Sequence, residues 1–211
     1  MKKIHTVVLA IGLVVGNANA TDFSFTGDFK DDDEVQEFQF TVAGPASDVT
    51  LRTWSYAGGT NAAGAEIVRG GFDPIVALFD GSTGNLIDQN DDSGLVADPV
   101  SGTSYDSFLM HNLSAGDYTA TVTQYSSFAN GPTLINGFSG SGRTDFGSRD
   151  SHWALDILNV SSASIGDSYV SATPPPIPEP ESYALLLAGL GLVTFMGRRR
   201  MSEDTMASIG T

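Results

Sequence analysis

Apolar and polar residues alternate with a period of two in several short runs of this chain. The clearest runs are EFQFTV (37–42), DYTATVTQY (117–125) and HWALDIL (152–158). Such alternation is typical of β-strands with one buried face. The residues predicted to face the core are Phe38, Phe40 and Val42, then Tyr118, Ala120 and Val122, which lie opposite three threonines, and finally Trp153, Leu155 and Ile157. Further strands are predicted at 23–29, 49–56, 74–79, 85–88 and 106–113.

Nothing in the interior of the chain keeps a 3.6-residue apolar period. The connections, such as AGGTNAAGAE and NGFSGSGRTDFG, are rich in residues that favour turns. About eight short strands with such turns predict an all-β fold, an antiparallel jelly-roll-like β-sandwich over residues 21–172. Residues 126–151 are either an extra hairpin or a mobile loop.

The first twenty residues, MKKIHTVVLAIGLVVGNANA, have two lysines, a short apolar stretch and the small-x-small sequence Ala18-Asn19-Ala20. This pattern predicts a secretory signal peptide that signal peptidase cuts after Ala20. The alternatives are a first transmembrane helix or a buried core helix. The stretch is too short to span a membrane, and small and polar residues follow it, which disfavours both.

The predicted domain is strongly acidic. Residues 21–172 contain five Lys and Arg against 21 Asp and Glu, which gives a net charge of −16. A field of this sign repels nucleic acid and anionic lipid head groups, so neither is expected as a partner. The chain has no cysteine, which excludes thiol catalysis and thiolate metal sites.

The composition changes sharply after the domain. Residues 173–181 form a Pro-rich linker, and 182–200 are predicted as a transmembrane helix that ends in an arginine cluster. The sixteen uncharged residues from Ser182 to Gly197 would reach roughly 24 Å as a helix, against a hydrocarbon core of about 30 Å. The arginines and the tail 201–211 would stay in the cytoplasm by the positive-inside rule. A C-terminal core helix is the alternative.

The motif Pro178-Glu179-Pro180, followed by a Gly- and Leu-rich apolar run and by Arg198, Arg199 and Arg200, resembles the PEP-CTERM sorting signal. The resemblance implies export across the inner membrane of a Gram-negative bacterium, transient anchoring of the precursor there, and cleavage by an exosortase. The mature protein would reach the cell surface or the extracellular space, among the exopolysaccharide and biofilm matrix that such bacteria make. The eleven residues after the arginines are a departure, because the family usually ends almost at once.

The domain also resembles the DVUA0089 family of proteins with this sorting signal. The resemblance rests on FSFTGDFKDDDEVQEFQFTV, LRTWSYAGGTNAAG, GGFDPIVALFDGSTGNLIDQNDD and LSAGDYTATVTQYSSFANG. More distantly, these stretches look like the bacterial pre-peptidase C-terminal domain, a jelly-roll sandwich attached to secreted enzymes. The first family implies no particular activity. Collagenase relatives of the second bind substrate and calcium.

Two acidic clusters follow predicted strands, Asp31, Asp32 and Asp33 with Glu34, and Asn90, Asp91 and Asp92. Adjacent carboxylates repel one another unless water or a cation surrounds them, and oxygen ligands on a loop suit Ca²⁺. Either cluster is therefore a candidate calcium site or a solvated acidic turn, and no other cofactor is expected. Asp73-Pro74 and Asp80-Gly81 are predicted to make turns.

Other candidate chemistry is weak. Trp54, Tyr56 and Trp153 are either a carbohydrate-stacking surface or aromatic residues of the core and rim. His111 and His152 have no zinc-binding spacing, and no G-x-S-x-G sequence is present. The sequence therefore predicts a non-enzymatic surface or matrix protein with a structural or adhesive role, possible ligands being extracellular polysaccharide and Ca²⁺. The alternative is a secreted hydrolase or an accessory domain of an extracellular enzyme.

Overall fold

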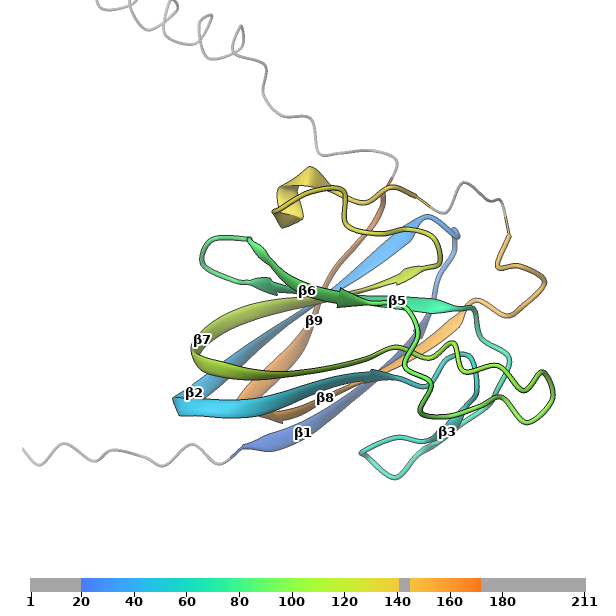
Figure 1. Ribbon diagram of the computed structural model, residues 1–211, viewed down its shortest axis with the longest axis horizontal. Coiled ribbons are helices and arrows are strands. Elements are labelled where there is room, and N and C mark those ends of the chain that lie inside the picture. Colours follow the sequence, from blue (N-terminus) through green and yellow to red (C-terminus); the bar gives the residue numbers. More distant parts are fainter. Residues whose placement is uncertain (1–19, 141–144, 172–211) are drawn as a thin grey trace, which may run out of the picture. The chain divides into compact units, whose positions relative to one another are not determined.

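The computed structural model describes residues 20–140 and 145–171. Over these residues the chain is all-β, with one short 3₁₀ turn, η1 (Figure 1). The elements are β1 (Thr21–Asp28), β2 (Glu34–Thr53), β3 (Gly59–Thr60), β4 (Glu66–Ile67), β5 (Pro74–Asp80), β6 (Leu86–Asn90), β7 (Phe108–Gln124), η1 (Leu134–Asn136), β8 (His152–Val160) and β9 (Ser162–Val170). The predicted all-β, antiparallel class is confirmed.

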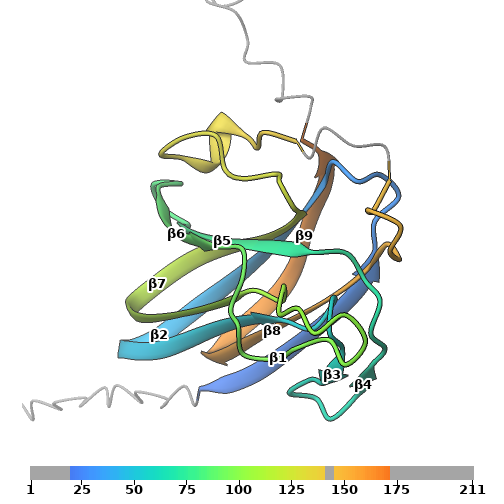
Figure 2. The ribbon, with the colours of Figure 1, turned by 45° about the vertical axis from the view of Figure 1, so that its right-hand side comes forward.

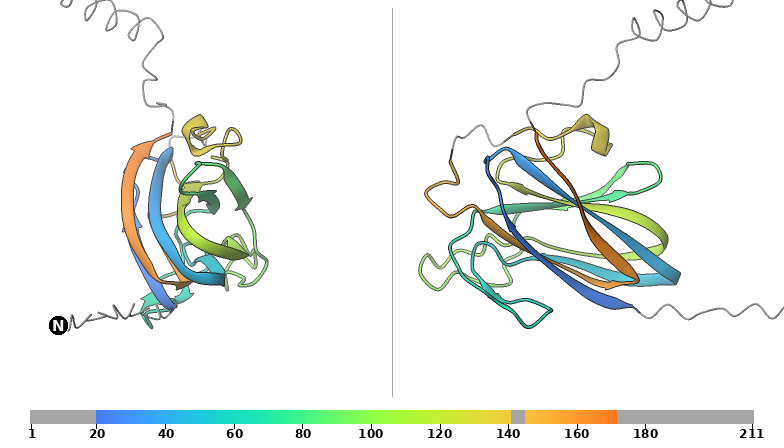
Figure 3. Two further views of the ribbon diagram at one scale, coloured as in Figure 1. Left: turned by 90° about the vertical axis from the view of Figure 1, so that its left-hand side faces the viewer. Right: turned by 180° about the vertical axis from the view of Figure 1, so that it is seen from behind.

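Two long strands hold the β-sandwich together. The order β1-β8-β2-β7-β5-β6 is antiparallel throughout, and β9 pairs with the first half of β2, from Glu34 to Thr41. The second half of β2, from Thr50 to Thr53, pairs with β8 instead. On its other edge β2 pairs with β7 along both halves, so β9 and β7 lie on opposite sides of β2 (Figure 3). The second half of β2 and the first half of β7 lie in one layer with β8 and β1, and the first half of β2 and the second half of β7 lie in the other layer with β9, β5 and β6. Because β2 and β7 enter both layers, side chains from both layers meet in one core.

The predicted core faces are confirmed in β2, β7 and β8. Phe38, Phe40 and Val42 are at most 2% exposed, and the predicted inward residues of β7 and β8 belong to the same cluster. Trp153 packs edge-to-face on Phe38, with 5.4 Å between the ring centroids.

The sequence predicted separate strands where the structure has continuous ones. The predicted runs 37–42 and 49–56 are two parts of β2, which ends at Thr53, and 106–113 and 117–125 are two parts of β7. A register shift between Val42 and Ala46 lies where the sequence suggested a turn. The polar stretch AGPASD therefore bends a continuous strand and does not end it, because an irregularity in the pairing absorbs the extra residues.

The β5 strand is buried on both faces, as its uninterrupted apolar run suggests. Val76 and Leu78 face the main core, whereas Ala77 and Phe79 face a second cluster with Phe138. The Phe79 and Phe138 rings are perpendicular, with 6.3 Å between centroids. Of residues 126–151, predicted as an extra hairpin or a mobile loop, residues 126–139 thus form a packed loop over this outer face (Figure 1).

The threonines of β7 are buried, although the sequence predicted them on the polar face. Thr119, Thr121 and Thr123, predicted to lie opposite the core-facing residues on the polar face, are at most 9% exposed. The Thr123 hydroxyl donates to the carbonyl oxygen of Ser127 at 2.7 Å. This backbone acceptor satisfies the buried Thr123 hydroxyl, whereas the Thr121 hydroxyl is buried without a hydrogen-bond partner.

The sequence did not predict β9, the short turn η1 or the small β3–β4 hairpin, which Figure 2 shows at one end of the domain. In the turn after β5, by contrast, the prediction for Asp80 is confirmed. One carboxylate oxygen of Asp80 accepts from the amides and hydroxyls of Ser82 and Thr83. These donors, first the Ser82 hydroxyl, lower the pKa of Asp80 to about 2.

The predicted signal peptide with Ala18, the linker, the sorting helix with its arginines, and the tail lie outside the described residues. Within the described ranges, no helix is long and apolar enough to cross a membrane.

Candidate functional site

A cleft of about 410 Å³ lies at one edge of the sheet, where β5 begins and where β6 and β7 end. The antiparallel register brings these ends together, since Pro74 is opposite Gln124 and Val76 is opposite Asn90. The cleft is lined by Tyr56, Asp73, Asp91, Asp92, Tyr105, Gln124, Tyr125, Phe146, Gly147 and Arg149.

Three carboxylates converge in this cleft. Asp73 immediately precedes β5, and Asp91 and Asp92 immediately follow β6. One carboxylate oxygen of each lies within 4.8 Å of the others. Burial raises the pKa of Asp91 to about 6, and the negative charge of Asp92 adds to the rise. Burial also raises the pKa of Asp92, so this part of the cleft is unfavourable for negative charge.

The backbone on either side of the carboxylates is held by the buried hydroxyl of Ser107. It lies 2.7 to 2.8 Å from the carbonyl oxygens of Pro74, Asn90 and Asp91. The Asn90 side chain is used within the protein as well. Its oxygen accepts from the amide of Phe108 at 2.9 Å, and its nitrogen donates to the carbonyl of Asp92. Asn90 thus shapes the loop through these two hydrogen bonds, and its role as a ligand stays a prediction.

Gln124 is a further polar group of the cleft, and the sequence gave no sign of it. The side chain is 1% exposed. Its nitrogen donates to the carbonyl oxygen of Asp145 at 3.3 Å, whereas its oxygen is buried without a hydrogen-bond partner. Because a carbonyl oxygen can only accept, the contact with Asp145 fixes which end of the amide is the nitrogen.

The remaining wall of the cleft is positively charged and aromatic. The guanidinium of Arg149 lies 3.5 Å from the centre of the Tyr56 ring and donates to the carbonyls of Gly71 and Tyr56 at 2.7 Å. Asp98, fully buried, accepts two hydrogen bonds from Arg69. Arg69 lowers the pKa of Asp98 well below its usual range. This network fixes Arg149 against Tyr56.

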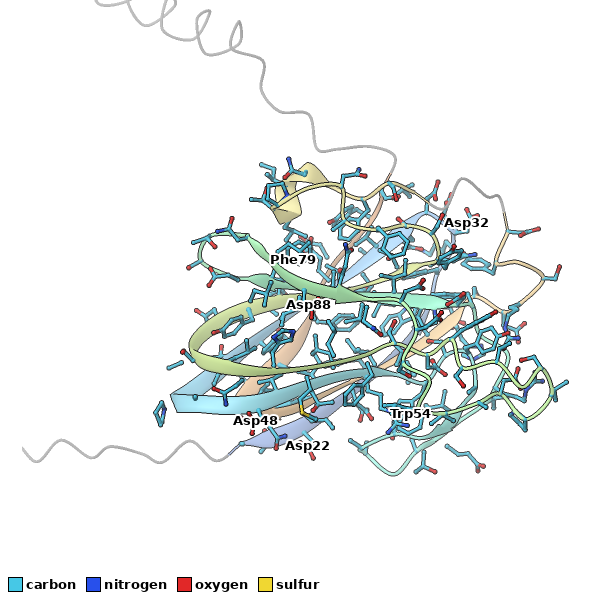
Figure 4. All side chains as sticks on the ribbon, in the orientation of Figure 1. Asp22, Asp32, Asp48, Trp54, Phe79 and Asp88 are labelled. Carbon is cyan, nitrogen blue, oxygen red and sulfur yellow. The ribbon has the colours of Figure 1, made fainter. Side chains whose placement is uncertain are left out.

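The other acidic cluster, Asp31, Asp32 and Asp33, lies in the loop between β1 and β2, where Figure 4 labels Asp32. Its carboxylate oxygens also approach within 4.8 Å of one another. Asp32 is buried, Asp33 half-buried and Asp31 exposed. The Asp33 amide donates to the Asp31 carboxylate at 3.0 Å. Among the described residues the two acidic loops form two separate clusters, so the structure does not combine them into one site.

The three aromatic residues considered for carbohydrate stacking lie in different surroundings. Trp153 is in the core, and Tyr56 is 7% exposed beneath Arg149. Trp54, labelled in Figure 4, donates its indole N–H to Asp156 at 2.7 Å and packs under Arg52. They form no common platform. The exposed rings of the cleft are those of Tyr105 and Tyr125, each a little over one-third exposed.

The histidines lie on different strands with different partners. His111 on β7 contacts the Asp88 carboxylate on β6 at 2.8 Å. His152 at the start of β8 contacts the carbonyl oxygen of Val68 at 2.9 Å.

The remaining evidence on function lies beyond the domain. The proline-rich stretch, the apolar run and the arginines satisfy the complete pattern of a known targeting signal. Residues 176–200 match the PEP-CTERM protein-sorting motif. This motif implies an exported protein with a membrane-anchored precursor that an exosortase processes.

The sorting motif covers only the C-terminal part of the chain. For the domain, the pre-peptidase C-terminal domain of a collagenase from Bacillus anthracis shows weak structural similarity. The TM-score is 0.35 at 13% sequence identity, covering 68% of this chain and 90% of that one. No curated protein matches the sequence. The resemblance of the domain to the DVUA0089 family therefore stays a prediction.

Proposed function

We propose that the chain is a non-enzymatic structural or adhesive protein of the cell surface or extracellular matrix of a Gram-negative bacterium. The sorting motif at 176–200 is the observation that carries this proposal. In the proposed precursor, signal peptidase cuts after Ala20, and residues 182–200 hold the chain in the inner membrane. Exosortase then cuts near Pro178-Glu179-Pro180 and releases a jelly-roll-like domain.

The charge of the domain supports a role in the aqueous space outside the cell. A net charge of −16 over residues 21–172 keeps an exported protein soluble and away from anionic membranes. The same field repels anionic polysaccharide. Adhesion to an acidic matrix therefore requires a bridging cation, whereas a neutral glycan has no such requirement. The exposed rings of Tyr105 and Tyr125 provide stacking surfaces for a sugar at the cleft.

The export part of the proposal is tested by the intact mass of the protein from culture medium and from membranes. We expect a mature form that begins at Thr21 and ends close to the 178–180 tripeptide. A strain without its exosortase should retain the longer precursor in the membrane fraction. Recovery from the medium of a chain that still contains residues 185–200 would overturn the export route.

The adhesive part needs a separate experiment. Purified matrix polysaccharide, both acidic and neutral fractions, is immobilised and exposed to the mature protein in Ca²⁺ and in EGTA. We expect binding to the matrix that a Tyr105→Ala, Tyr125→Ala double variant loses, with an exposed Ile135→Ala variant as control. Matrix binding that the double variant retains would remove the cleft from the proposal, and hydrolysis of the polysaccharide would favour the alternative of a secreted hydrolase.

A further inference from the structure

The cleft contains a set of oxygen atoms that the proposed surface role leaves unexplained. Asp73, Asp91 and Asp92 come from two separate loops, and their carboxylates converge within 4.8 Å. Such convergence on one point is unfavourable for like charges, unless a cation lies between them. Neither Asp91 nor Asp92 forms an ion pair with a basic side chain in the described part of the chain.

An acidic cluster alone is common on protein surfaces, and Gln124 is what distinguishes this one. Its side chain is 1% exposed, lines the same cleft, and keeps an amide oxygen without a hydrogen-bond partner. One carboxylate oxygen of Asp91 is likewise buried without a partner. A buried acceptor left unsatisfied lowers the stability of the folded protein, and such groups in native structures usually bind water or an ion.

The kinds of atom indicate which ion would bind. All four candidate ligands are oxygens, three from carboxylates and one from an amide, a set that hard cations prefer. Two ligands of one Ca²⁺ ion lie at most about 5 Å apart, twice the usual Ca–O distance of 2.3–2.6 Å. The three carboxylate oxygens lie within 4.8 Å of one another, so a single Ca²⁺ ion can contact all three. Mg²⁺ requires shorter bonds of about 2.0–2.1 Å in a near-ideal octahedron and usually keeps several waters, whereas Ca²⁺ accepts more oxygen ligands in a flexible geometry.

We propose that the carboxylates of Asp73, Asp91 and Asp92, together with the side-chain oxygen of Gln124, bind a Ca²⁺ ion. The ion links the start of β5 to the ends of β6 and β7. The cleft volume of about 410 Å³ leaves room for water to complete the coordination. This proposal does not depend on the proposed surface role. With Ca²⁺ bound, the ion in the cleft would remain accessible from solvent to further oxygen ligands.

The Asp31–Asp33 loop provides a matched control. It also brings three carboxylates within 4.8 Å, but the described residues show no buried amide oxygen without a partner at that loop. Asp31→Asn combined with Asp33→Asn removes two negative charges, one more than Asp91→Asn removes in the cleft, so an effect of net charge alone would be larger in this control. The two clusters can therefore be compared directly.

Binding is measured on the secreted mature protein after treatment with chelator. Ca²⁺ is titrated by calorimetry, and Tb³⁺ is titrated as a luminescent substitute, excited through the tyrosines that line the cleft. We expect one Ca²⁺ site with a Kd between about 1 µM and about 1 mM, the range of sensors and extracellular modules. Ca²⁺ should displace Tb³⁺ and remove its sensitised emission.

Substitutions locate the site. Asp91→Asn and Gln124→Met should each weaken Ca²⁺ binding at least about tenfold, because the first removes the negative charge of a ligand and the second removes an oxygen ligand. Asp31→Asn combined with Asp33→Asn should change the affinity less than about twofold. At a Ca²⁺ concentration 100 times the wild-type Kd, the wild-type Tm should rise by roughly 5–10 °C, and at the same concentration the Tm of Gln124→Met should rise by about half as much or less.

Three results would overturn the proposal. The first is no binding to the wild-type protein up to about 10 mM Ca²⁺, above the range of extracellular modules. The second is binding that survives Asp91→Asn and Gln124→Met unchanged, and the third is binding that is lost only with Asp31 and Asp33. If Gln124→Met does not fold, Asp91→Asn decides the question, because Asp91 is only half-buried.

Discussion

The buried carboxylate of Asp106 holds the turn that follows β2, and its removal should lower the free energy of unfolding substantially. Asp106 is 4% exposed. It accepts from the Thr53 hydroxyl at 3.0 Å and from the amides of Tyr56 and Ala57 at 3.1 and 2.7 Å. Asp106→Ala leaves three donors without this acceptor. At roughly 1–3 kcal/mol for each buried unsatisfied group, less the cost of burying the carboxylate itself, the net loss is about 3–4 kcal/mol.

Urea unfolding measures this loss directly. With an m value of about 2 kcal/mol/M, the midpoint should fall by about 1.5–2 M. Asp117→Ala is the control, because Asp117 accepts one exposed hydrogen bond from the Thr41 hydroxyl and should change stability by less than about 0.5 kcal/mol. A loss below about 1 kcal/mol for Asp106→Ala, or one equal to that of the control, would show that water satisfies the donors and would refute the reasoning.

The same variant has a predictable pH dependence. Burial is the largest cause that raises the pKa of Asp106, and its hydrogen bonds oppose the rise. The folded state therefore keeps the Asp106 proton to a higher pH than the unfolded state, and stability from this group falls as the pH rises above about 4. Asp106→Ala lacks this contribution, so its destabilisation should be larger near pH 4 than near pH 7.

Three further substitutions test other parts of the molecule. Phe138→Ala should lower the free energy of unfolding in urea by about 3 kcal/mol, because it leaves a cavity in the outer cluster on β5. Ile135→Ala, at an exposed position, should be nearly neutral. Gly27→Ala would place its Cβ only 2.4 Å from the Trp153 ring. We expect a shift of the tryptophan fluorescence and a loss of about 1–3 kcal/mol in the free energy of unfolding. An unchanged spectrum would contradict this packing. Replacing residues 178–180 with alanines should leave the membrane-bound precursor uncut, measured as its intact mass.

Much of the fold could be predicted because burial on one face leaves a clear pattern. The alternation in β2, β7 and β8 identified the core residues correctly. The continuity of β2 could not be predicted, since AGPASD has the composition of a turn and only the pairing partner β7 keeps it extended. The β9 strand was missed because SASIGDSYV is mostly exposed and therefore carries little apolar signal.

The site was harder to predict than the fold. The sequence indicates Asp91 and Asp92 as candidate ligands, whereas it predicts Asp73 as a turn residue and carries no signal for Gln124. Their proximity follows from the register of β5 against β6 and β7, which no local pattern encodes. Gln124 lies in DYTATVTQY as one more polar residue of a strand, and only its burial shows that its oxygen is unusual.

The passage of β2 and β7 through both layers bears on how long the exported protein can last. One layer cannot separate while the other stays intact, because β2 and β7 belong to both layers and would lose strand pairing in both. Separation of the two layers is then nearly as unfavourable as complete unfolding, which leaves few forms of the exported protein in which the core strands can be cleaved by proteases. A chain without cysteine cannot form disulfides. In this domain, two strands that pair in both layers oppose partial unfolding, as disulfides do in other secreted domains.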